Sequence, residues 1–206
     1  MNLAQSAKPL AQRLPGVEYP QSPNIVDVAW PIVPASPWRR VAAWLLDYLL
    51  IAAYLVVLTA VSLGLGLSPM QAGITSTLSR LFAAELVGFL TLTLPVVLYF
   101  AVCEASRWRA TLGKRALRLA VVDKQGGRLT VRGALLREAV RFFPWELSHA
   151  MLYRVALSTD RGSIAVGVTI GFVVVYALVG LYLVTLFIGS HRTVYDRLAG
   201  SLVIQR

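Results

Sequence analysis

One carboxylate lies inside the first long apolar stretch of the chain. Asp47 falls within residues 41–67, about 27 residues that are otherwise apolar apart from a few Tyr, Thr and Ser, whereas roughly 20 suffice for a helix to cross a bilayer. A charged carboxylate inside such a helix costs about 2.5–3.5 kcal/mol on insertion scales. Arg40 and Tyr54 lie seven residues to either side, so the three residues share one helical face. In lipid, this polar stripe has to face protein or water.

Two roles are open for Asp47. In the first, it binds a cation or a proton and Arg40 tunes its pKa. In the second, it belongs to a structural clamp, in which buried polar groups satisfy one another and nothing is transported. Asp196 follows the last apolar stretch. Since Asp196 and Arg40 should both lie near the cytoplasmic surface, an ion pair between them would hold the C-terminal tail against the first helix.

Three further polar residues lie in or near apolar stretches. Glu85 either completes an ion path with Asp47 or faces lipid headgroups, and the second interpretation is favoured. Glu146 and His149 are spaced i, i+3 and share one helical face. One such pair suits a proton relay better than a metal, because di-metal carboxylate bundles use two sets. We therefore expect no metal and no cofactor.

The chain has no recognisable catalytic set. There is no GxSxG, HExxH or Walker loop, and the sequence holds only two His and one Cys. The single cysteine, Cys103, lies in an apolar run and is expected to be a small core residue. An enzyme is therefore not expected.

The composition is that of an integral membrane protein. Hydrophobic residues make up 57% of the 206 residues and charged residues 15%, against about 25% charge in an average soluble domain. The net charge is +10. Because no aromatic platform accompanies the basic residues, we expect them to face anionic lipid headgroups and not nucleic acid.

Apolar stretches predict an all-α protein with about four transmembrane helices. The predicted spans are residues 41–67, 78–103, 142–157 and 164–188, and Pro95 is expected to kink the second. Residues 142–157 carry several polar side chains, so they either cross the membrane or lie in the interface. Four spans with both termini inside place 17 of 20 Lys and Arg on the cytoplasmic side, which the positive-inside rule favours. The expected location is the cell inner (plasma) membrane.

Two segments outside the spans have their own patterns. Residues 1–36 are rich in proline and lack helical periodicity, which predicts a disordered cytoplasmic tail. Their lack of an apolar run argues against a cleaved signal peptide. Alternating apolar residues around the turn-like segment 123–127 predict a small cytoplasmic β-hairpin at about residues 115–131. Thr130 is positioned to cap a helix that starts near Val131.

Three separated motifs resemble the RDD family of membrane proteins. Residues 40–47, RVAAWLLD, look like its opening signature. Residues 111–123 are similar to its TLGKR…L.VVD segment, and residues 196–201, DRLAGS, to its closing DRLAGT signature. Arg137 lies where the family usually has an Arg. The resemblance covers about residues 38–204 and would make residues 37–206 one RDD-like transmembrane domain.

The chain departs from the family pattern at a few positions. Arg118 and Ala120 occupy positions that are often Gly and Arg, Tyr195 replaces the usual His, and Ser201 replaces Thr. The resemblance implies a role in transport, with cation/proton antiport suggested for some members.

Two functions remain open from the sequence. The first is a transporter or transporter subunit for a cation or small solute, with Asp47 in the path. The second is a non-transporting membrane scaffold or assembly partner. Four spans rarely enclose a gated path, so a homo-oligomer or a larger membrane complex is expected. A transporter should leave Asp47 accessible to water, whereas a scaffold should seal it against a neighbour.

Overall fold

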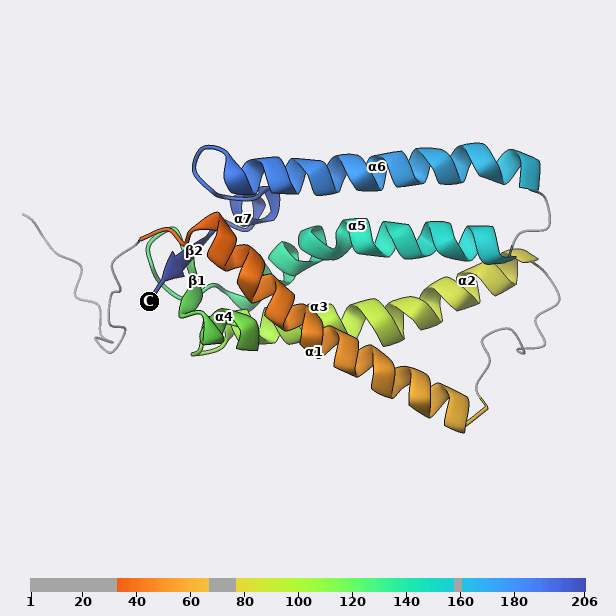
Figure 1. Ribbon diagram of the computed structural model, residues 1–206, viewed down its shortest axis with the longest axis horizontal. Coiled ribbons are helices and arrows are strands. Elements are labelled where there is room, and N and C mark those ends of the chain that lie inside the picture. Colours follow the sequence, from red (N-terminus) through yellow and green to blue (C-terminus); the bar gives the residue numbers. More distant parts are fainter. Residues whose placement is uncertain (1–32, 67–76, 158–160) are drawn as a thin grey trace, which may run out of the picture.

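The structure, a computed structural model, describes residues 33–66, 77–157 and 161–206 (Figure 1). Most of the predicted disordered tail therefore lies outside the described residues. Long helices run along the length of the molecule, and short elements gather at one end. The long segments are α1 (Pro37–Gly64), the continuous run of α2 (Thr77–Gly88), η1 (Phe89–Thr93) and α3 (Leu94–Ala105), α5 (Val131–Leu157) and α6 (Arg161–Phe187). The short elements are α4 (Leu112–Ala116), β1 (Leu119–Asp123), α7 (Val194–Leu198) and β2 (Ser201–Gln205).

Three helices of the described chain are long and apolar enough to cross a membrane. They comprise residues Pro37–Gly64, Ser79–Ala105 and Val166–Phe187, and they correspond to three of the predicted spans. Their outward faces expose many large apolar side chains, as expected of surfaces in lipid. The fourth long helix, α5, contains the predicted segment 142–157 and lies beside α3 and α6, but it is not among these three.

The second apolar segment is irregular just before Pro95, the residue that is expected to kink it. A π-helical turn, η1, precedes this proline, which lies in the first turn of α3. Proline has no N–H to donate to the carbonyl four residues earlier, that of Thr91. The Tyr54 hydroxyl of α1 donates to this carbonyl at 2.5 Å. Tyr54 thus faces protein, as the polar stripe on α1 requires.

The predicted hairpin at residues 115–131 is wrong. β1 pairs antiparallel with β2 from the C-terminal tail, from Leu119 opposite Gln205 to Asp123 opposite Ser201. The first part of the predicted hairpin belongs to helix α4, whose N-cap is Thr111. The turn after β1 does form, but only one bridge, Val122 to Arg128, follows it. Four of the five residues of β1 are buried. Other segments therefore have to pack on both faces of the strand, which a short local hairpin cannot do.

The start of α1 and the C-terminus meet at one end of the molecule. Ala35 N donates to Val203 O at 2.9 Å, and Pro34 bridges Ile204. α5 also starts at this end, where the Thr130 hydroxyl accepts from Gly133 N at 3.1 Å as the capping pattern predicts. The two-stranded sheet therefore connects both ends of the described chain beside the N-terminus of α5.

Candidate functional site

Arg137 is the centre of a buried ionic cluster at the sheet end of the bundle. Its Nε and Nη2 donate to Asp196 Oδ1 at 3.0 and 2.9 Å. Its Nη1 donates to both oxygens of Glu104, at 2.7 and 2.6 Å, and to Glu138 Oε1 at 2.5 Å. The Arg137 side chain is only 2% exposed. One guanidinium thus joins α3, α5 and α7.

Asp196 receives a second arginine from α1. Arg40 Nη2 donates to Asp196 Oδ2 at 2.6 Å, and Arg40 Nη1 donates to the His191 carbonyl at 2.5 Å. Thr193 and Asp196 form a capping box at the start of α7. Burial alone raises the pKa of Asp196, but Arg40 and Arg137 outweigh it and hold this pKa well below its usual range. The ion pair considered between Arg40 and Asp196 is present, and it holds the tail against α1.

Lys114 and Arg141 complete the cluster. Lys114 Nζ donates to Glu104, and Arg141 Nη1 donates to Glu138 Oε2 at 3.1 Å. With every group ionised, four cations face three carboxylates, so the cluster carries one net positive charge.

Asp47 lies outside this cluster. It is 1% exposed, and its two oxygens accept from Thr111 Oγ1 at 2.6 Å and from Gly113 N at 2.8 Å. Arg40 points to Asp196 instead, so it does not serve as the partner of Asp47. The Asp47 carboxylate holds the N-terminus of α4 against α1, where it satisfies a backbone N–H that the helix leaves unpaired.

The remaining candidate residues lie farther from the sheet end and are not part of the cluster. Glu85 forms an ion pair with Arg154, at 2.5 Å, and not a path with Asp47. Glu146 accepts from Thr93, and His149 contacts the edge of its helical neighbour Trp145. In the described ranges, no group of three or more His, Cys, Asp or Glu is arranged to hold a metal ion.

Several residues of the cluster escaped the sequence interpretation. The sequence predicts that Lys114 and Arg141 anchor the surface with the rest of the basic segment, but the structure buries them. The sequence prediction also lacks Glu104 and Glu138. The spacing of Glu138 and Arg141, i and i+3, was the one local signal for a pair.

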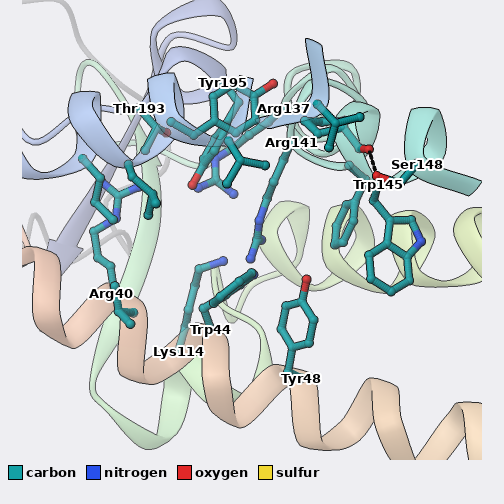
Figure 2. Close-up of a pocket in the computed structure, with 18 residues that line it drawn as sticks. Arg40, Trp44, Tyr48, Lys114, Arg137, Arg141, Trp145, Ser148, Thr193 and Tyr195 are labelled. Atoms are coloured by element: carbon teal, nitrogen blue, oxygen red, sulfur yellow. Dashed lines mark hydrogen bonds between the residues drawn. The ribbon is translucent and has the colours of Figure 1, made fainter. Parts of the chain in front are cut away.

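A cavity of about 330 Å³ adjoins the cluster, between α1, α5 and α6 (Figure 2). Among the described residues, the charged ones that line it are four cations and none is Asp or Glu; the cations are Arg40, Lys114, Arg137 and Arg141. Figure 2 shows the ends of Lys114, Arg141 and Tyr48 pointing into the same space. Because the cluster carries one net positive charge and its cations line the cavity, we expect this space to favour an anion.

The rest of the cavity wall is apolar and aromatic. Its largest contributions come from α1, α5 and α6, with Trp44, Phe142, Trp145, Val179 and Leu183 among them. A pocket of this size, mostly apolar with a few convergent polar groups, is typical of small-molecule sites.

Comparison with known proteins identifies the family. A family model described as the RDD family matches residues 34–200. The chain belongs to the RDD family. Searches of the curated proteins and of the solved structures found no match. In this RDD chain, all three motif regions meet at one end: Arg40, Lys114 and Asp196 belong to the cluster, while Asp47 and Thr111 join α1 to α4.

One departure from the usual RDD pattern lies in the site itself. Tyr195, at the position where the family usually has His, lines the cavity. Its ring lies 5.2 Å from the Arg137 guanidinium and meets Tyr182 edge to face. An aromatic face therefore takes the place of an imidazole beside Arg137 in this RDD protein.

Proposed function

We propose that this RDD protein is a four-span membrane protein that binds an anionic ligand at the end of the bundle that carries the ionic cluster. The observation that supports the binding function is the cavity wall, whose charged members are all cations. The four-span arrangement rests on α5. Arg137, near its start, contacts the cluster, whereas Arg154, near its end, pairs with Glu85 of α2. A helix that makes contacts at both ends of the bundle extends as far along it as the three apolar helical segments do, which supports a fourth span.

The proposed orientation places the sheet end in the cytoplasm. Many basic residues at this end are exposed, and the positive-inside rule assigns a surface rich in Lys and Arg to the cytoplasmic side. The exposed basic residues include Arg39, Arg107, Arg115, Arg118, Lys124, Arg128 and Arg132. We also propose the plasma membrane as the location and a homo-oligomer or larger complex as the assembly, from composition and span number alone.

Cysteine labelling tests the topology. In a Cys103→Ala background, Ala156→Cys near the end of α5 should react with a membrane-impermeant maleimide in intact cells. Gln205→Cys in β2 should react only after permeabilisation, because four spans put these positions on opposite sides. If α5 lay along the cytoplasmic interface, three spans would remain and the two labelling patterns would be exchanged. That exchange would reject the four-span arrangement.

Two observations weigh against cation transport through Asp47. This side chain is buried, and both of its oxygens already accept hydrogen bonds from α4 or its N-cap. A carboxylate that has to bind and release a cation needs access to water, which this arrangement does not provide. The sealed Asp47 favours the second candidate function, a non-transporting membrane scaffold. Anion binding is compatible with such a scaffold and gives it a ligand.

Phosphate binding in detergent tests the proposed function. Inorganic phosphate should raise the melting temperature of the wild type above its value in chloride at equal ionic strength, because a ligand that binds only the folded state stabilises it. Arg141→Gln should lose most of this increase. The matched control is Arg154→Gln, which removes an arginine at the other end of α5 and should keep it. Equal melting temperatures in the two salts, together with no Arg141-dependent binding of any anion, would reject the proposal.

A further inference from the structure

The cavity has two chemically different parts. At one end, Arg40, Lys114 and Arg141 present cationic nitrogens, and their side chains are at most 10% exposed. The lining also includes apolar side chains, with Val179 and Leu183 of α6 among them. A small inorganic anion would use only the first part. A ligand that uses both parts carries an anionic group joined to a hydrocarbon chain.

Arg141 has capacity for such an anionic group. One nitrogen of its guanidinium donates to Glu138, and its central carbon lies over the Phe100 ring, 4.5 Å from the ring centre. A guanidinium has five N–H donors, so several remain for a ligand in the cavity. The Tyr48 hydroxyl also points into the cavity and has no hydrogen-bond partner among the described residues. Phosphate oxygens match this set of donors.

One end of the cavity lies at the depth where lipid headgroups are found. Arg40 is in the first turn of α1, next to exposed Trp38, and Trp residues concentrate at the membrane–water interface. Tyr48 is eight residues farther along α1, about 12 Å deeper at 1.5 Å per residue. The cavity therefore extends from the interface at Arg40 to the depth of Tyr48, where Lys114 and Arg141 also point into it.

The cavity also opens toward lipid. Two of its lining residues, Trp44 of α1 and Leu183 of α6, are 39% and 50% exposed. These two helices form opposite sides of the cavity, and α5 forms its floor. A ligand that is already in the bilayer can reach the cations between α1 and α6 without passing through water.

From these observations we propose that the ligand is an anionic phospholipid of the cytoplasmic leaflet. Its phosphate binds the cations at Arg141 and Lys114, and the first part of one acyl chain lies along Val179 and Leu183. The volume of about 330 Å³ admits these parts only, so the rest of the lipid remains in the bilayer. This inference rests on the proposed anion-binding function and names its ligand class.

Native mass spectrometry of the full-length protein tests the inference. Delipidated protein in detergent would be titrated with phosphatidylglycerol, phosphatidylcholine or inorganic phosphate. We expect one phosphatidylglycerol to bind about ten-fold more tightly than phosphatidylcholine, and Arg141→Gln to reduce this affinity by about ten-fold, the effect of losing charge-assisted hydrogen bonds. Val179→Trp fills the apolar wall and should weaken phosphatidylglycerol by a similar factor. The matched control, Val173→Trp, lies on the exposed face of α6 outside the cavity.

The outcomes separate the two proposals. If phosphate stabilises the protein through Arg141 but Val179→Trp leaves phosphatidylglycerol binding unchanged, the site binds an anion and the lipid inference is overturned. Equal affinity for phosphatidylglycerol and phosphatidylcholine would also overturn it. If neither phosphate nor phosphatidylglycerol shows dependence on Arg141, the anion-binding function fails together with the inference. If phosphate still raises the melting temperature of the Val179→Trp protein, this variant is folded.

Discussion

Replacing Arg137 with methionine should destabilise the folded protein by about 3–5 kcal/mol, the usual cost of removing one partner from a buried ionic group. Methionine retains much of the side-chain volume but none of the charge. Glu104 and Asp196 are both fully buried and would each lose hydrogen bonds from Arg137, and Glu138 would lose another. Because folded proteins are stable by only about 5–15 kcal/mol, we expect a large drop in melting temperature and much less monodisperse protein after detergent extraction.

Two further variants make the Arg137 prediction specific. Arg132→Met removes an exposed arginine from the first turn of the same helix and should change stability by no more than about 0.5 kcal/mol. Arg137→Lys keeps one positive charge but lacks the planar fork that reaches three carboxylates, so it should lie between the wild type and Arg137→Met. The prediction fails if Arg137→Met melts as the wild type does, since the cluster would then contribute nothing to the fold.

Gly113→Ala is expected to separate α4 from α1. A β-carbon at this position would lie 2.2 Å from the Ala43 carbonyl oxygen and 2.9 Å from the Asp47 carboxylate. The Ala43 oxygen belongs to the backbone of α1, so it cannot move aside as a flexible side chain would. The overpacking and the lost hydrogen bonds to the buried Asp47 should together cost on the order of 3 kcal/mol, measured as a lower melting temperature in detergent.

The matched control for Gly113→Ala is Gly180→Ala in α6, where an added β-carbon would meet no atom within 4 Å. It should leave the melting temperature unchanged or slightly raise it, because alanine is the better helix former. A double variant gives a sharper check. If Gly113→Ala already breaks the contact with Asp47, adding Asp47→Ala should cost much less than Asp47→Ala does alone. Strictly additive losses would contradict the proposed contact.

The long helices were predictable because their signal is local. In a bilayer, a run of twenty or more apolar residues can satisfy the hydrogen bonds of its own backbone only as a helix, whatever its neighbours are. The three most apolar segments, the irregularity at Pro95 and the cap at Thr130 all follow from neighbouring residues. The family prediction is confirmed for a related reason: the motifs at residues 40–47, 111–123 and 196–201 are readable one at a time, and the family model matches residues 34–200.

The partners of these motifs were not readable in the same way. Alternation in β1 correctly predicts a strand, but only tertiary structure decides that its partner is β2 from the C-terminal tail and not the segment after the nearby turn. Asp47 and Arg40 share a helical face by spacing, yet Asp47 binds α4 and Arg40 binds Asp196.

The sequence by itself therefore determined the membrane class, the family and most of the helices, because these depend on hydrophobicity and spacing within a single segment. The tertiary structure decided which charges meet. Arg137 and Asp196 are 59 residues apart, and Arg40 and Asp196 are 156 apart. Whether two buried charges stabilise one another depends on their separation in space and on the loss of water around them. Neither quantity exists until the helices have packed, so the cationic cavity could not be predicted from the sequence.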